Sequence, residues 1–416
     1  MKKILTFVCL SALFAGCNDK EEPHIKDYAV PEMADRTVLI YMAAENNLSD
    51  YAVDGRIPGT SIDGDLKQIK TGAYDLGNNN LLVFVDQADK NTLPYLARIA
   101  DGEMRDSIPM ETDLLTSDPA TLERMMRTAV NDYPAREYAL VLWGHASGWL
   151  IESDSVAYDP TPRAARRKAY GRDTGNNSAS GSSGSWMNIP SMAKALANAL
   201  QTRKLAYIFA DCCHFQCAEV AYELRNVCDY IIASPAEIPA EGAPYQTIVP
   251  ALFEPTTFWR SIVDRYFEQT SYGFKEPLSV VKTSEMETLA AATRQALYDT
   301  FSEAEDRYPD LSHLIHYYYV RYPFYDANDF MLRHASSNVY AEWKKALDAA
   351  VIYKTMTTTW MTNAPWGTYY SDFEVTEERY GGISMFVPSW SYQGSTNSTI
   401  QQMAWYNAAG LSAIGW

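Results

Sequence analysis

Two residues that could carry out nucleophilic catalysis each follow an apolar, strand-like run. His145 comes just after residues 138–143, and Cys213 comes just after residues 205–209 and Asp211. In an open parallel α/β sheet, reaction sites lie beyond the carboxyl ends of the strands. If these two strands are neighbours, an imidazole and a thiol meet at one edge of the sheet. That pair is the minimum set for a cysteine nucleophile with a histidine partner.

Strand-like and helix-like segments alternate around these two residues. Strands are predicted over residues 37–43, 81–85, 138–143, 205–209 and 228–233. Helices are predicted after the cap residues Ser117 and Asp118, around residues 192–200 and over residues 217–224. This alternation predicts an α/β fold with a mostly parallel sheet flanked by helices. Cys213 would then precede a helix N-terminus, whose partial positive charge favours the thiolate.

One long loop is predicted between the two residues, over residues 152–185. Its second half, residues 174–185, consists almost wholly of Gly, Ser, Asn and Ala. Its first half is basic, with Arg163, Arg166, Arg167, Lys168 and Arg172. Loops of this length are usually functional or disordered, and exposed loops are preferred sites of proteolytic nicking. The basic cluster is therefore a partner-binding patch, a cleavage site or an ordinary solvated loop.

The N-terminus has the features of an export signal. Lys2 and Lys3 precede an apolar run over residues 4–14, which is too short to span a bilayer, and small residues then precede Cys17. This ending resembles a bacterial lipoprotein signal, so residues 1–16 are expected to be removed and Cys17 to be lipidated. The acidic tether over residues 17–34 resembles the surface-export tag of Bacteroidetes lipoproteins. An outer-membrane or cell-surface location is expected, with the periplasm or ordinary secretion as the alternative.

Composition limits the other partners. A chain of 416 residues with 47% hydrophobic content can bury a sizeable core. The net charge of −17 argues against nucleic acid, whose phosphates would be repelled. Of the six cysteines, those beyond the signal lie in one window: Cys212, Cys213, Cys217 and Cys228. This clustering argues against a disulfide framework, and it lacks the paired spacing of structural zinc, so no metal ligands are assigned.

Three ordered segments resemble the clostripain-type cysteine peptidases, which share the caspase and gingipain fold. They are residues 37–48, which match the opening strand, residues 140–149, which match the catalytic His motif, and residues 211–224, which match the catalytic Cys motif. The resemblance implies a caspase-like catalytic domain over residues 35–255, with the loop over residues 152–185 as its activation loop. It also implies an additional α/β C-terminal region over residues 256–416, packed on the catalytic domain.

The resemblance also implies roles for individual residues. His145 and Cys213 match the catalytic dyad, and Asp211 matches the acidic residue of the S1 pocket, which would select Arg or Lys at P1. Backbone N–H groups of Ala146 and Cys213 would hold the oxyanion, although the family usually has Gly at position 146. Such a peptidase would cut its own loop within the basic cluster at residues 163–172. The expected partners are therefore proteins or peptides with a basic P1 residue.

Three alternatives stay open. Some family members need calcium, and Asp86, Asp154, Asp159 and Asp173 could supply oxygen ligands, although no calcium-loop pattern is present. The chain could instead be a catalytically inactive surface lipoprotein that acts as a binding module, since His214 and Ala146 depart from the family pattern. In the third alternative, the aromatic-rich half after about residue 254 binds a glycan or protein ligand, against the simpler explanation of a packed core.

Overall fold

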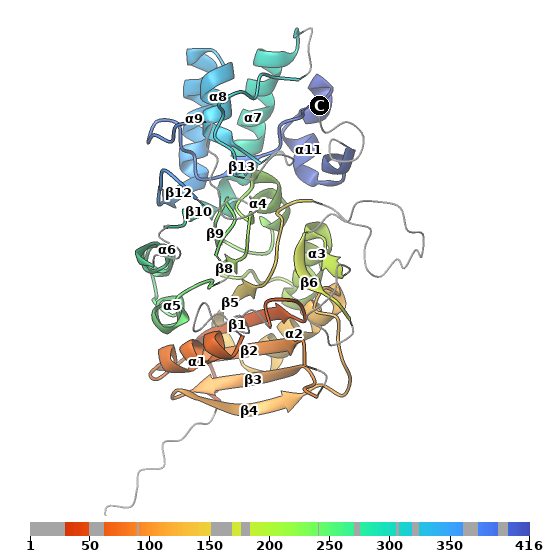
Figure 1. Ribbon diagram of the computed structural model, residues 1–416, viewed down its shortest axis with the longest axis vertical. Coiled ribbons are helices and arrows are strands. Elements are labelled where there is room, and N and C mark those ends of the chain that lie inside the picture. The colour runs from red at the N-terminus through yellow and green to blue at the C-terminus, as the bar shows by residue number, and fades with distance from the viewer. Residues whose placement is uncertain are drawn as a thin grey trace, which may run out of the picture. The chain divides into compact units, whose positions relative to one another are not determined.

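A nine-stranded mixed sheet forms the centre of the structure, which is a computed structural model (Figure 1). Its five central strands are parallel and lie in the order β9–β8–β5–β1–β2. Their bounds are β1 (Ala34–Ala44), β2 (Asn80–Gln87), β5 (Ala135–Trp143), β8 (Tyr207–Asp211) and β9 (Tyr230–Ala233). The predicted α/β class is therefore confirmed, and each of the five predicted strands is present.

The structure describes residues 30–49, 62–89, 91–150, 169–175, 184–239, 241–269, 275–304, 308–317, 324–360, 373–389 and 398–416. Within this set, Pro31–Trp416 belong to one unit. Cys17, the predicted signal and most of the predicted tether lie outside the described residues. No helix in the described part of the chain has the length and apolar character needed to cross a bilayer.

Antiparallel strands extend both sides of the parallel core. Beyond β2 lie β3 (Tyr95–Ala100) and β4 (Glu103–Pro109). Beyond β9 lie β10 (Ser279–Lys282) and β12 (Val351–Lys354). The last two strands come from the C-terminal region, which therefore continues the same sheet. The domain border predicted at residue 255 falls between helices α5 (Tyr245–Leu252) and α6 (Phe258–Glu268), and it stays a prediction.

Helices cover both faces of the sheet (Figure 1). On one face, α1 (Ile62–Gly72), α5 (Tyr245–Leu252) and α6 (Phe258–Glu268) pack on alternate strand residues and form the main hydrophobic core. On the other face lie α2 (Pro119–Asp132), α3 (Ile189–Leu200) and α4 (Ala218–Leu224). The predicted cap of α2 is present, because the Asp118 carboxylate accepts the N–H of Ala120 at 2.9 Å.

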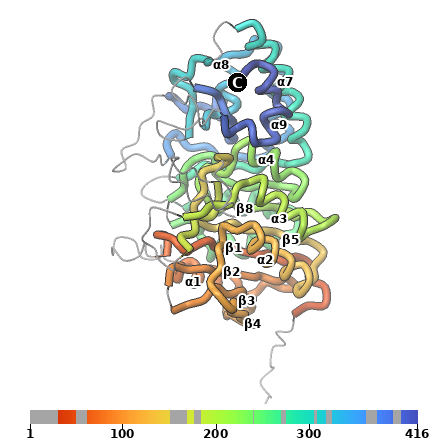
Figure 2. The backbone as a smooth tube through the Cα atoms, turned by 90° about the vertical axis from the view of Figure 1, so that its right-hand side faces the viewer, coloured from red at the N-terminus to blue at the C-terminus, as the bar shows by residue number. Residues whose placement is uncertain are grey.

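The C-terminal region adds helices beyond the β10 side of the sheet (Figure 1), at the end of the molecule opposite β3 and β4 (Figure 2). It contains α7 (Met286–Phe301), α8 (Ala327–His334), α9 (Ser337–Ala350) and α11 (Ala404–Ala408), the short strands β11 (Tyr325–Asp326) and β13 (Ser384–Met385), and the 3-10 turns Thr283–Glu285, Ile400–Gln402 and Leu411–Ile414. Its aromatic side chains Tyr317, Phe324 and Trp360 are buried. For these residues the packed-core explanation is therefore favoured over a glycan surface.

The loop predicted over residues 152–185 contains one short strand and ends at the start of another. Tyr170–Asp173 form β6, and Ser185–Met187 form β7, which pairs with it in an antiparallel ribbon. The buried ring of Tyr170 explains the strand, because its hydroxyl donates to the carbonyl of Tyr41 at 3.0 Å. The polar composition of residues 174–185 hid this pairing from a reading of the sequence.

Candidate active site

The structure brings His145 and Cys213 to the same edge of the sheet. β5 and β8 are neighbours, and Trp143 is paired with Asp211 at their carboxyl ends. His145 and Cys213 each lie two residues beyond that pair, as the sequence predicts. Gly144 makes the turn that follows β5: its φ is +141°, and a Cβ there would lie 3.0 Å from the carbonyl oxygen of Ala43.

Asn47 positions the imidazole, and sequence reasoning missed it. His145 Nε2 lies 3.0 Å from Asn47 Oδ1, which also accepts from Arg172 Nη1 at 3.2 Å. A guanidinium can only donate, so Oδ1 is the acceptor in both contacts and Nε2 carries the proton. The lone pair of a neutral His145 is then assigned to Nδ1. Asn47 follows the end of β1, at the same sheet edge, and that position was the available signal.

The Cys213 thiol lies against a backbone segment that follows β9. Its Sγ accepts the N–H of Ile238 at 3.5 Å. Burial raises the pKa of the thiol, and the negative charges of Glu237, Glu276 and Asp211 raise it further. As predicted, Cys213 lies between β8 and α4, and α4 begins at Ala218. The backbone between Cys213 and that helix is not helical, because the N–H groups of residues 214 and 216 bind carbonyls of the segment that follows β9. Helix α4 therefore does not explain how the thiolate forms.

Asp211 is buried beneath the site. Its carboxylate accepts the N–H of Ala243 at 3.0 Å and the hydroxyls of Tyr245 at 2.9 Å and Tyr266 at 3.4 Å. Burial outweighs these hydrogen bonds and raises the pKa of Asp211 to about 6. Only glycine fits at position 242, where φ is +58° and a Cβ would lie 2.8 Å from Asp211 Oδ2. Asp211 is 4% exposed, so a substrate side chain would reach it only if the residues that contact its carboxylate moved aside.

Two further carboxylates accompany Asp211, and the sequence did not single them out as site residues. Glu237 and Glu241 belong to the segment that follows β9. Two backbone N–H groups of this segment contact the site: that of Ile238 donates to Cys213 Sγ, and that of Ala243 donates to the Asp211 carboxylate. Each glutamate is half-buried, and its Oε2 has no hydrogen-bond partner among the described residues. Burial raises the pKa of Glu237 to about 7 and also raises that of Glu241. Glu237 and Asp211 make the surroundings of Cys213 acidic and suited to a cation.

Two backbone donors near the nucleophile are uncommitted. Ala146 faces Tyr170 in an antiparallel bridge, but the hydrogen bonds of that bridge use the N–H groups of Ser147 and Gly171. No hydrogen bond between described residues uses the N–H of Ala146 or of Cys213. Both predicted oxyanion donors therefore remain available to a ligand.

The neighbouring cysteines and His214 are structural. Cys212 is buried, and its thiol lies 3.3 Å from the carbonyl oxygen of Leu142. His214 is buried, stacks on Phe324 with ring centroids 5.4 Å apart, and has its pKa lowered to about 4 by burial. Cys217 and Cys228 are buried and free of disulfides. His214 is thus a core residue rather than a second base.

Most of the predicted cleavage residues, Arg163, Arg166, Arg167 and Lys168, lie outside the described residues. Arg172 is described, and it lies within β6 with its guanidinium on Asn47. A peptidase binds its substrate as a free extended segment, so a residue that already lies within a β-ribbon is a poor place for cleavage.

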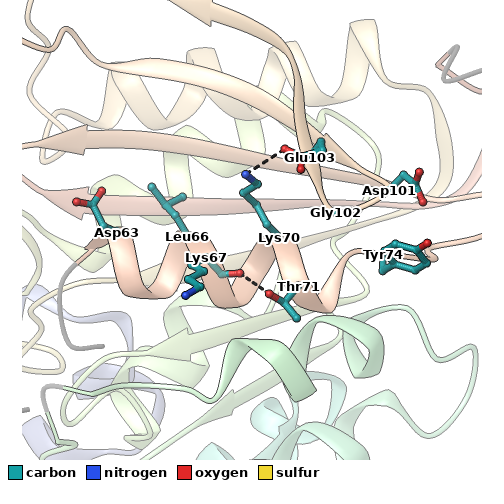
Figure 3. A pocket seen from close by; sticks show the side chains of 9 residues that line it. All are labelled: Asp63, Leu66, Lys67, Lys70, Thr71, Tyr74, Asp101, Gly102 and Glu103. Carbon is teal, nitrogen blue, oxygen red and sulfur yellow. Dashed lines mark hydrogen bonds and ion pairs between the residues drawn. The ribbon is translucent and has the colours of Figure 1, made fainter. Parts of the chain in front are cut away.

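A pocket of about 680 Å³ elsewhere on the protein does not contain these residues (Figure 3). It is an open hollow between α1 and the turn joining β3 to β4. Lys70 and Glu103 form an ion pair of 3.1 Å across it, and Tyr74 lines one end. None of the predicted site residues lines this pocket, so we assign it no part in the chemistry.

The fold and the pairing of a histidine with a cysteine at one sheet edge define a caspase-like cysteine peptidase. The clostripain family model matches residues 40–405. The chain therefore belongs to the clostripain family of cysteine peptidases, known as C11.

Solved structures agree with this assignment. A secreted C11 cysteine protease from Bacteroides thetaiotaomicron, in complex with an irreversible peptide inhibitor, is 29% identical with a TM-score of 0.73, covering 91% of this chain and 100% of that chain. An inactive zymogen C11 protease from Parabacteroides distasonis is 30% identical with a TM-score of 0.69, covering 92% and 99%. No curated protein matches the chain.

Proposed function

We propose that this chain is a secreted cysteine endopeptidase that cleaves after Arg or Lys, with Cys213 as nucleophile and His145 as its partner. The observation that carries the proposal is the position of both residues beyond adjacent parallel strands, beside carboxylates that no described ion pair neutralises. The relative from Bacteroides thetaiotaomicron, described as a secreted cysteine protease, supports both the reaction class and the export.

The proposed reaction is acyl transfer. The Cys213 thiol gives its proton to His145 Nδ1, and the sulfur attacks the carbonyl carbon of the scissile bond. The N–H groups of Ala146 and Cys213 donate to the oxyanion. The imidazolium then protonates the leaving amine as the C–N bond breaks. Water, deprotonated by His145, hydrolyses the thioester and restores the thiol.

A positively charged P1 side chain would favour ionisation of the Cys213 thiol, whose pKa is raised in the free protein. In the free protein, Glu237 and Asp211 oppose ionisation of Cys213. A P1 guanidinium or ammonium bound beside Glu237, Glu241 and Asp211 would neutralise these charges and lower the thiol pKa. Basic P1 selectivity and activation of the nucleophile would then have one physical cause.

Self-activation is proposed within residues 163–168, where Arg163, Arg166, Arg167 and Lys168 offer the enzyme its own preferred residue. Arg172 is the least suitable of the predicted residues because β6 already holds it. The relative from Parabacteroides distasonis, described as an inactive zymogen, is consistent with activation by cleavage. We also propose that Cys17 carries a lipid that anchors the protein at the outer membrane, as its signal-like N-terminus suggests.

One observation favours a second candidate function. The raised thiol pKa is also what a catalytically inactive surface lipoprotein, acting as a binding module, would show. Intact-mass analysis and an Arg-aminocoumarin assay on the protein and its Cys213→Ala variant separate the two. Hydrolysis and two fragments split within residues 163–168, both lost in the variant, support the peptidase. If both proteins remain intact and silent, the binding module becomes the better explanation.

A further inference from the structure

Three carboxylates from separate elements meet at the same sheet edge as the catalytic residues, but at β1 and β2. Glu45 directly follows β1, Asp86 lies near the end of β2 and is paired with Ala43, and Asp113 follows β4. One carboxylate oxygen from each residue lies within 4.8 Å of those of the other two. Like charges this close repel one another strongly when they are withdrawn from water.

Asp86 is the informative member of this cluster. Its side chain is fully buried, and neither Oδ1 nor Oδ2 has a hydrogen-bond partner in the described part of the chain. No ion pair between described residues includes Asp86 or Asp113. A buried carboxylate is costly unless an opposite charge or hydrogen-bond donors accompany it. Among the described residues, neither oxygen of Asp86 has the partner that burial requires.

We propose that Glu45, Asp86 and Asp113 bind a calcium ion. Carboxylate oxygens are hard ligands, which suit Ca²⁺ and not the softer metals that favour thiolate or imidazole. Glu45 and Asp86 are buried, whereas Asp113 is the most open of the three and marks the side from which the ion and its water ligands enter. Of the four aspartates that the sequence offered for calcium, Asp86 belongs to this site, and Asp154 and Asp159 lie outside the described residues.

Asp173, the fourth of these aspartates, supports the site from behind. Its carboxylate accepts the hydroxyl of Thr116 at 2.8 Å and the N–H of Gly175 at 2.8 Å, so both of its oxygens are already held. The N–H of Thr174 donates to the carbonyl of Glu45 at 3.1 Å, which ties β6 to the end of β1. An ion bound to Glu45 would therefore stabilise the chain just after β1, two residues before Asn47.

The test measures binding rather than catalysis, so its failure is distinct from a failure of the proposed peptidase. Calcium is titrated by calorimetry into metal-free Cys213→Ala protein, which cannot cut itself, and thermal unfolding is followed with and without calcium. Asp86→Asn is added in the same background, with the exposed Asp132→Asn at the end of α2 as matched control. We expect one bound ion, a raised Tm, a loss of affinity of roughly tenfold or more in Asp86→Asn, and unchanged binding in the control.

Burial and the neighbouring carboxylates raise the pKa of Asp86 to about 9, so in the metal-free protein its side chain is protonated at neutral pH. Asp86→Asn replaces this neutral group with a neutral amide of similar size, so the metal-free Tm should stay close to that of the parent. If it fails to fold, the more exposed Asp113→Asn takes its place. The proposal is overturned if calcium up to about 10 mM produces neither heat nor a Tm change. It is equally overturned if the variants at Asp86 or Asp113 bind calcium as well as the parent does.

Discussion

Glu237 is expected to lower the reactivity of the Cys213 thiol in the free enzyme and to raise kcat/KM for a substrate with a basic P1 residue. The variant Glu237→Gln separates these two effects. The N–H of the next residue, Ile238, lies 3.5 Å from Cys213 Sγ, so the Glu237 carboxylate is on the order of 10 Å or less from the sulfur. Two unit charges at that distance interact by about 1.7 kcal/mol at an effective dielectric constant near 20, or roughly one pKa unit. Glu237→Gln should therefore lower the pKa of the thiol by about one unit.

The assay follows alkylation of the free enzyme by iodoacetamide at pH 8 to 9, where Glu237, with a pKa of about 7, is ionised. Because the thiolate is the reactive form, the rate should rise about tenfold in the variant. The kcat/KM for an Arg substrate should fall, because the guanidinium loses a counter-charge. The exposed Glu303→Gln, at the end of α7, is the control and should change neither. Two rates that move in the same direction would refute the reasoning.

Three other outcomes are expected. Cys213→Ala should abolish hydrolysis of an Arg substrate while far-UV circular dichroism stays unchanged; residual turnover above the uncatalysed rate would point to another nucleophile. Asn47→Ala should lower kcat roughly tenfold with little change in KM, and Asn47→Asp should restore activity and move the acid limb of the pH–rate profile upward. Burial raises the pKa of Glu219 to about 7, so the folded state keeps a proton that the unfolded chain releases near pH 4.5. Stability should therefore fall by roughly 3 kcal/mol as pH rises from 4.5 to 7, and urea unfolding of Glu219→Gln should show a correspondingly smaller fall.

The parallel core could be predicted because its strands are continuous apolar runs. β1, β5 and β8 are buried on both faces, and such runs read clearly in a sequence. β4 was missed because most of its side chains are exposed, so no apolar alternation marks it. β6 and β7 were missed because they are short and flank a Gly- and Ser-rich tract.

The site was predictable where it depends on strand ends and not where it depends on how the chain folds back. His145 and Cys213 were found because each ends an apolar run. Glu237 could be assigned to the site only from the structure, because the contact of Ile238 with the Cys213 thiol, 25 residues earlier in the chain, places the neighbouring Glu237 there. The helix predicted after Cys213 is present as α4, but the sequence did not show that carbonyls of the later segment bind the N–H groups of residues 214 and 216, between Cys213 and the helix start.

The carboxyl edge of this sheet carries two groups of carboxylates that lack a cation from the described protein. Asp211 and Glu237 lie near Cys213, and Asp86 and Asp113 belong to the cluster at β1 and β2. No ion pair between described residues includes any of these four side chains. If both proposals hold, a bound ligand supplies the positive charge for each group. The basic side chain of a substrate supplies it for the first group, and calcium supplies it for the second. The two binding events can be measured separately. Calcium should raise Tm without a substrate, and a basic P1 residue should activate the thiol whether or not calcium is bound.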